Sequence, residues 1–152
     1  MKNLLILFLF FSILSCKQEF PKQYWQKGNL HTHSFWSDGD DFPEMILKWY
    51  KENNYQFIAL SDHNTIANGS YWYKLKNLDK QNRTLEKYQK SFGDWVETKV
   101  DSSGTFVRLK TFEEYKLKIE SAGSFLIIRS EEVTSSFENK PVHINVTNIK
   151  DK

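Results

Sequence analysis

The stretch that decides the fold runs from residue 28 to residue 64 and has the sequence GNLHTHSFWSDGDDFPEMILKWYKENNYQFIALSDHN. Residues 29–33 alternate in polarity, which predicts a first strand. Residues 41–53 carry apolar side chains at helical spacing, and Asp41 is placed to cap this helix. The unbroken apolar run 57–60 is typical of a strand that is buried on both faces in a parallel sheet. The stretch therefore predicts a strand, a helix and a second strand.

Downstream, the pattern predicts a helical insertion and a hairpin. Residues 70–92 are rich in lysine and have few apolar side chains, which favours a largely exposed helix. Two short alternating runs, 95–100 and 105–109, flank the turn-forming residues 101–104 and predict a hairpin.

A second helix and two further strands follow the hairpin. Thr111 and Glu114 have the spacing of a capping box, and we expect the helix that they open to end at Gly123. The apolar run 125–128 predicts another buried strand, and residues 142–146 predict one more. Strands that alternate with helices favour an α/β fold with a mostly parallel sheet.

Charge excludes one class of partner. The chain has 152 residues with 21 basic and 19 acidic side chains, a net charge of +2, and these charges are spread along the sequence. Nucleic-acid binding domains gather basic side chains on one face. We therefore expect no nucleic-acid partner.

The first 15 residues have the features of a signal peptide: Lys2, an apolar run at 4–14, and Ser15 before Cys16. The apolar run is too short to span a membrane, which takes about 20 residues. The sequence ILSC ending at Cys16 resembles a bacterial lipobox, so we expect a lipid on this single cysteine. Residues 16–27 would then tether an exported lipoprotein to the periplasmic or cell-surface side of a membrane. An ordinary signal peptide with a chance cysteine is the alternative.

The residues that can carry chemistry lie at the ends of predicted strands. His31 and His33 are two residues apart, so in an extended strand both imidazoles leave the same face. His63 closes the second strand, and His143 lies inside the last one. Because the carboxyl ends of parallel strands assemble sites at one edge of a sheet, we expect these side chains to converge. The nearby carboxylates are those of Asp38, Asp62, Glu131 and Glu132.

Four motifs in this order resemble those of the PHP (polymerase and histidinol phosphatase) superfamily. They are GNLHTHS with SDG at 28–39, LSDHN at 60–64, EEVT at 131–134 and VHIN at 142–145. The stretch 36–64 is most similar to PHP metallohydrolases related to carbaryl hydrolase. The insertion at about residues 66–110 matches no motif of the family.

The resemblance implies a distorted (β/α)7 barrel, with residues 28–152 as its N-terminal part. It also implies about two or three divalent ions, of zinc, manganese or iron. Asp62 is expected behind the ligands, where it would orient a ligand or hold the turn. The motifs imply that one ion is bound by His31 and His33, another by Asp38 and His63, and a third by His143, with Glu132, rather than Glu131, as the bridge.

The function implied is that of a metal-dependent hydrolase acting on a small-molecule ester. Imidazole and carboxylate ligands suit borderline divalent ions, and such ions lower the pKa of a bound water and offset charge on the ester oxygens. No catalytic side chain beyond the metal ligands is then needed. A phosphoester is the commonest substrate class among relatives, and a carbamate ester is the alternative within the subgroup. The competing hypothesis is a surface lipoprotein that binds a ligand, for example a glycan, and in which the metal motifs have only a structural role.

The family motifs continue beyond the last histidine of this chain. A further histidine and a late Asp-x-His are part of the family pattern, and no histidine follows His143. We therefore expect a fragment of a longer protein, with an incomplete ligand set and an exposed sheet edge. A short non-catalytic relative is the alternative.

Overall fold

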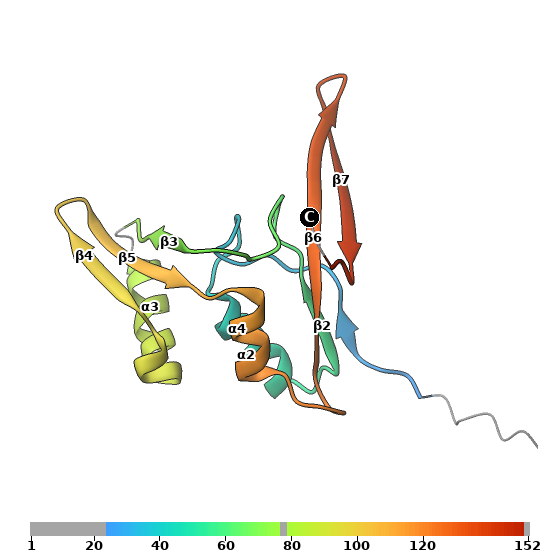
Figure 1. Ribbon diagram of the computed structural model, residues 1–152, viewed down its shortest axis with the longest axis horizontal. Coiled ribbons are helices and arrows are strands. Elements are labelled where there is room, and N and C mark those ends of the chain that lie inside the picture. Colours follow the sequence, from blue (N-terminus) through green and yellow to red (C-terminus); the bar gives the residue numbers. More distant parts are fainter. Residues whose placement is uncertain (1–23, 77–78, 151–152) are drawn as a thin grey trace, which may run out of the picture.

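A computed structural model describes residues 24–76 and 79–150 and shows a mixed α/β fold with two sheets (Figure 1). The predicted signal peptide, Cys16 and the first part of the tether lie outside these residues. Within the described ranges, no helix is long and apolar enough to cross a membrane.

The main sheet has the strand order β1-β2-β6-β7. β1 and β6 both run parallel to β2, whereas β7 runs antiparallel to β6. The sheet is therefore mixed, and the expectation of a mostly parallel sheet is not confirmed. The strands span Gly28–Asn29 (β1), Phe57–Leu60 (β2), Leu126–Phe137 (β6) and Lys140–Thr147 (β7).

The antiparallel pair arises from a two-residue turn. Glu138 and Asn139 join β6 to β7, and both have positive φ angles, of 48° and 60°. This conformation is the one that reverses a strand within two residues, so β7 must return along β6. The resulting β6–β7 hairpin projects well beyond the rest of the molecule (Figure 1).

Two helices cover one face of β2 and β6. Helix α2 spans Pro43–Glu52 and helix α4 spans Phe112–Ile119. Leu47 of α2 is fully buried with Ile58 of β2 and Ile127 of β6 in one apolar cluster, which also contains Tyr115 of α4. This cluster fixes the carboxyl end of β2 beside β6, which is where the candidate site forms.

The start of α2 differs from the prediction. Phe42, not Asp41, occupies the N-cap position, and no side chain caps the helix. Asp41 lies one residue earlier, where its Oδ1 accepts a hydrogen bond from the Phe42 backbone N–H at 2.8 Å. Pro43 then opens the helix, as its fixed φ favours. The predicted end is confirmed, because Asn53 is the C-cap residue.

The capping box of α4 is confirmed, but its predicted end is wrong. Thr111 and Glu114 bond reciprocally at the N-terminus of the helix. The helix stops at Ile119 because Glu120 takes an extended ψ of 145° and Ser121 pairs with Phe125 in an isolated bridge. Gly123, with a φ of 75°, belongs to the turn that closes this bridge.

The insertion contains its own antiparallel sheet, of order β3-β5-β4. The predicted hairpin is confirmed, whereas the expectation of helix throughout residues 70–92 is wrong at its start. Three consecutive aromatic residues, Tyr71 to Tyr73, favour a strand and pair with β5. The elements are β3 (Tyr71–Lys74), α3 (Asp79–Phe92), the 3-10 turn η1 (Gly93–Trp95), β4 (Thr98–Asp101) and β5 (Gly104–Leu109).

Two strand boundaries near the site also differ from the sequence prediction. β1 ends at Asn29, so His31 and His33 lie in a loop and not in a strand. The Asn29 side chain accepts a hydrogen bond from the His31 backbone N–H at 3.0 Å, and this local bond replaces the next rung of the ladder. β6 is longer than predicted, because β7 extends its pairing to Phe137. Glu131 and Glu132 therefore lie inside β6 rather than after it.

Candidate metal centre

The loop that follows β1 brings two imidazoles together. Nε2 of His31 and Nε2 of His33 are 3.1 Å apart. The loop turns back tightly at Gly39, where an added Cβ would lie 2.4 Å from the backbone oxygen of His33. The expected juxtaposition of these histidines is therefore present, although a loop and not a strand creates it.

Asp62, just after β2, holds this loop in place. Its side chain is buried and accepts three hydrogen bonds of 2.7 Å, from the Ser34 backbone N–H and from the hydroxyls of Ser34 and Ser37. These hydrogen bonds fix the loop segment that contains His33 and Asp38. The role of Asp62 behind metal ligands stays a prediction.

His63 follows β2 and lies beside β6. The carbonyl of Asp62 accepts from the Glu132 N–H at 3.1 Å, and the carbonyl of Glu132 accepts from the Asn64 N–H at 3.0 Å. His63 thus forms a parallel bridge with Glu132. The ring of His63 packs edge-on against that of His33, with 4.4 Å between ring centroids.

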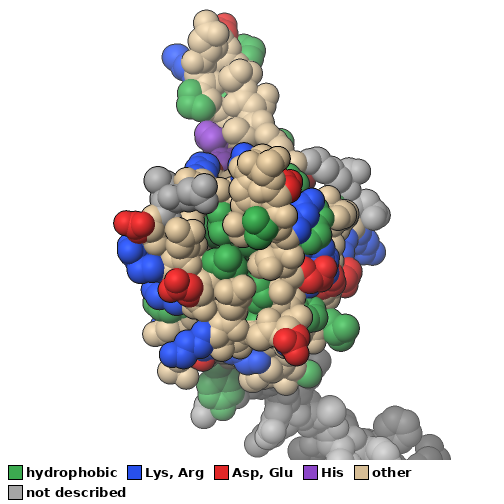
Figure 2. Space-filling view, turned by 90° about the vertical axis from the view of Figure 1, so that its left-hand side faces the viewer, with side chains coloured by type: hydrophobic (Ala, Val, Ile, Leu, Met, Phe, Trp, Pro, Cys, Tyr) green, Lys and Arg blue, Asp and Glu red, His purple; other side chains and the backbone are tan. Residues whose placement is uncertain are grey.

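Strand alternation selects which glutamate faces the histidines. Glu132 and Thr134 lie on one face of β6, and Glu131 lies on the other. In β7, His143 pairs with Thr134, so its imidazole emerges on the same face as Glu132. This face meets the two loops near the foot of the hairpin, where Figure 2 shows histidine side chains in purple.

The Glu132 carboxylate is the centre of the cluster. Its Oε2 lies 2.9 Å from Nε2 of His33, 3.2 Å from Nε2 of His31 and 3.2 Å from Nδ1 of His63. Its Oε1 lies 3.3 Å from Nδ1 of His143. All four histidines of the chain therefore surround one carboxylate, which is 4% exposed.

Despite these close neighbours, Oε2 of Glu132 is buried and accepts no hydrogen bond of ordinary geometry within the described residues. Burial opposes ionisation of Glu132, but the adjacent His31, His63 and His33 outweigh it and lower the pKa of the carboxyl. The group is therefore an anion in the neutral pH range. A buried carboxylate oxygen with three imidazole nitrogens around it and no hydrogen bond has the environment of a shared cation ligand.

Asp38 lies on the exposed side of the cluster. Its Oδ1 is 2.7 Å from Nδ1 of His33, and its Oδ2 is 3.5 Å from Nε2 of His63. The bond with His33 lowers the pKa of the Asp38 carboxyl, with further contributions from the charges of His33 and His63. Asp38 thus joins the His33 side of the cluster to the His63 side.

These side chains form three overlapping groups with a spacing that suits metal ions. The donor atoms within each group lie no more than 4.8 Å apart. Among the described ion pairs, neither Asp38 nor Glu132 contacts a lysine or arginine, so the local charge favours cations. The residues present therefore fit divalent ions. The groups are His31, His33 and Glu132; His33, Asp38 and His63; and His63, Glu132 and His143.

Two residues of the cluster were missed at the sequence level. The Thr134 hydroxyl lies 2.5 Å from Nδ1 of His63, and the Asn64 side chain bonds to both backbone groups of Thr134. The period of two along β6 places Thr134 on the same face as Glu132 and could have pointed to it. Asn64 gave no such pattern, because its contact spans 70 residues.

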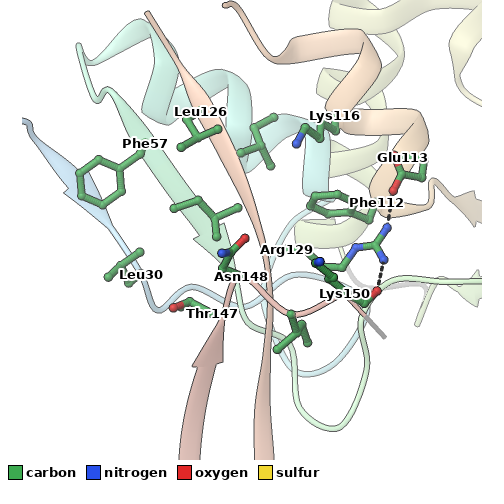
Figure 3. A pocket seen from close by; sticks show the side chains of 13 residues that line it. Leu30, Phe57, Phe112, Glu113, Lys116, Leu126, Arg129, Thr147, Asn148 and Lys150 are labelled. Carbon is green, nitrogen blue, oxygen red and sulfur yellow. Dashed lines mark hydrogen bonds and ion pairs between the residues drawn. The ribbon is translucent and has the colours of Figure 1, made fainter. Parts of the chain in front are cut away.

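A groove on the described surface lies apart from these ligands. It has a volume of about 780 Å³ and runs beside the first half of β6 toward α4, with Leu30, Phe57 and Leu126 at one end (Figure 3). At the other end, Arg129 forms an ion pair with Glu113 and donates to the Lys150 carbonyl at 2.8 Å. None of the six candidate ligands lines this groove.

No family model, no curated protein and no solved structure matches this chain. The resemblance to PHP proteins therefore stays a prediction from the four motifs and their order. What the fold adds is that residues from all four motifs meet at one site.

Proposed function

We propose that this protein is a metal-dependent hydrolase of the PHP type, with a phosphoester as its substrate class. The observation that carries the proposal is the environment of Glu132. A buried carboxylate oxygen lies within 3.2 Å of imidazole nitrogens from His31, His33 and His63, and among residues 24–76 and 79–150 it accepts no hydrogen bond of ordinary geometry. A divalent ion held by Glu132 with His31 and His33 would give this oxygen a partner, and a second ion would be held by Asp38 and His63.

The chain's own residues would hold about two or three ions, as the motifs imply. His31 and His33 would hold one ion with Glu132, Asp38 and His63 a second, and His143 a third. When bound, such ions lower the pKa of water and offset charge on ester oxygens.

Asp62 would contribute by keeping the loop of residues 31–39 in its ligating shape, because three hydrogen bonds fix that loop to its carboxylate. The partial barrel of the family is also a proposal. β1, β2 and β6 are parallel and adjacent, as in the first part of such a barrel, while β7 departs from that pattern.

The test is a metal analysis of the purified protein combined with hydrolysis of p-nitrophenyl phosphate, before and after chelation. We expect bound zinc, manganese or iron, and activity that falls on chelation and returns with the metal. His33→Ala should lose metal and activity together, because His33 contacts both carboxylates of the cluster.

The competing hypothesis of a ligand-binding lipoprotein predicts a different result. In that case the metal would be retained tightly, and no ester of the phosphate or carbamate class would be hydrolysed. A His33→Ala variant with unchanged metal content would contradict both the ligand assignment and the proposed hydrolase.

A further inference from the structure

Thr134 occupies a central position among the histidines. It lies two residues after Glu132 on the same face of β6, and its partner across the hairpin is His143. Its Oγ1 lies 2.5 Å from Nδ1 of His63, 3.2 Å from Nδ1 of His143 and 3.3 Å from the Glu132 carbonyl oxygen. The Thr134 hydroxyl therefore contacts two imidazoles and the backbone carbonyl of Glu132.

The backbone of Thr134 is locked in this position by Asn64. The Asn64 side chain accepts from the Thr134 N–H at 2.9 Å and donates to the Thr134 carbonyl at 3.0 Å. Asn64 directly follows His63 and has a φ of 52°, a conformation that asparagine tolerates better than most residues. The clamp thus sets the distance between the His63 ring and the Thr134 hydroxyl.

The Thr134 hydroxyl has a single proton, which limits the hydrogen bonds that it can form. A threonine hydroxyl has one proton to donate and can accept two hydrogen bonds. In the structure it donates to the Glu132 carbonyl. A hydroxyl that gives its proton to this carbonyl can only accept from the imidazoles, which favours a proton on Nδ1 of His63 and on Nδ1 of His143. The Glu132 carboxylate oxygens, which also can only accept, lie 3.2 and 3.3 Å from the same two nitrogens and favour the same tautomers.

We propose that Thr134 is a positioning residue that fixes His63 and His143 in the Nδ1–H tautomer and so leaves both Nε2 lone pairs for cations. For His63 the consequence is specific. Its Nε2 lies 3.5 Å from Oδ2 of Asp38, so it ligates with Asp38, while its Nδ1 side faces Thr134 and Glu132. The metal role rests on the proposed function, whereas the tautomer does not.

The tautomers are measured directly on the metal-free protein with ¹⁵N-labelled histidine, by long-range ¹H–¹⁵N correlation NMR at a pH of about 9, where imidazole is neutral. Substitution of each histidine in turn assigns the signals. The wild-type protein should show His63 and His143 protonated on Nδ1. A histidine exposed to water favours the Nε2–H form, so this result requires a specific partner.

Two variants of Thr134 separate the hydroxyl from the shape of the side chain. Thr134→Val has the same shape without the hydroxyl, and we expect His63 to shift toward the Nε2–H form. Thr134→Ser restores the hydroxyl and should keep the wild-type pattern. Thr147→Val makes the same exchange in β7 at a residue that lines the groove, and it should leave both tautomers unchanged.

Zinc titration of the same proteins supplies the second readout. Thr134→Val should weaken binding by about 10- to 100-fold, as is typical when a ligand histidine loses its supporting bond. Thr134→Ser should remain within a few-fold of the wild type.

Two results would overturn the inference: wild-type His63 protonated on Nε2, or the same tautomer in Thr134→Val as in the wild type. Failure of the wild-type protein to bind any divalent ion would overturn the proposed function and leave the tautomer result standing.

Discussion

Glu131 and Glu132 are adjacent in the sequence but face opposite sides of β6. Only Glu132 lies among the histidines, with its carboxylate oxygens 2.9 to 3.3 Å from four imidazoles. The two glutamates therefore form a natural matched pair for testing the site.

We predict that Glu132→Gln lowers the bound metal by at least one ion per chain, because an amide is uncharged and offers one oxygen where the carboxylate offers two. Glu131→Gln should keep the wild-type metal content. Both variants are compared by elemental analysis after circular dichroism has shown that they are folded. Equal metal loss in the two variants would contradict the assignment of Glu132 as the bridge.

A second buried carboxyl lies away from the metal cluster, in α2. Glu44 is fully buried, and its Oε1 accepts from the Trp95 indole at 3.0 Å. Within the described residues, its Oε2 and the Tyr88 hydroxyl form no hydrogen bond of ordinary geometry. Burial raises the pKa of Glu44 above 4.5, although the Trp95 bond opposes this shift.

Because the pKa of Glu44 is raised in the folded protein, folding favours the protonated carboxyl. Its contribution to stability is present below about pH 4.5 and is lost as the pH rises toward the folded-state pKa. Glu44→Gln mimics the protonated form, so the variant should be more stable than the wild type by about 1 kcal/mol at pH 8 and similar at pH 4. Urea unfolding at both pH values measures this, with the exposed Glu52→Gln as the control. A gain that is equal at both pH values would contradict the prediction.

At the scale of elements, the N-terminus of α4 is joined to β5 by a charged network. Glu114 completes the capping box with Thr111, and it also accepts two hydrogen bonds from Arg108, at 2.7 and 3.1 Å. The Arg108 bond is the main cause that lowers the pKa of Glu114 to about 2. One carboxylate thus stabilises the helix start and its attachment to the insertion.

Glu114→Gln should lower the free energy of unfolding at pH 7 by about 1 kcal/mol, since it weakens a helix cap and removes the charge that faces Arg108. A carboxyl with a lowered pKa stabilises the fold above pH 4.5, and this contribution is lost as the pH falls toward 2. The difference in unfolding free energy between the wild type and Glu114→Gln should therefore become smaller as the pH falls from 4.5 toward 2. Urea unfolding from pH 7 to pH 3 tests this, with the exposed Glu86→Gln as the control. If the difference in unfolding free energy between the wild type and Glu114→Gln stayed constant with pH, the ionised Glu114 carboxylate would not contribute to stability.

At the scale of the whole molecule, the candidate ligands come from three separate segments: the loop 31–38, the end of β2, and the β6–β7 hairpin. They meet only when the main sheet is assembled. A metal ion bound there would therefore bind the native state alone, and binding would stabilise the whole fold.

We predict that zinc at about 100 times its dissociation constant raises the free energy of unfolding by about 2.7 kcal/mol. For a domain of this size, the midpoint of thermal unfolding should rise by about 5 to 10 °C relative to the chelated protein. Scanning calorimetry with and without a chelator measures the shift, and His33→Ala should show little of it. A rise of the same size in that variant would indicate binding elsewhere.

Local sequence patterns are sufficient to predict several helices and strands of this protein. Pro43 and Asn53 bound α2, the apolar run 57–60 forms β2, and Thr111 with Glu114 caps α4. Each of these depends on side chains a few residues apart, so spacing and backbone preference were sufficient. The motifs also marked the histidines and carboxylates that meet in the cluster.

The way in which these elements combine depends on contacts between distant parts of the chain. β6 pairs in parallel with β2 across the whole insertion, and the loop of His31 and His33 takes its shape from bonds between Ser34 and Asp62, 28 residues apart. Thr134 joins the site through contacts with Asn64 and His63, at separations of 70 and 71 residues. Such contacts depend on which chain segments pack together, and no local pattern encodes that choice.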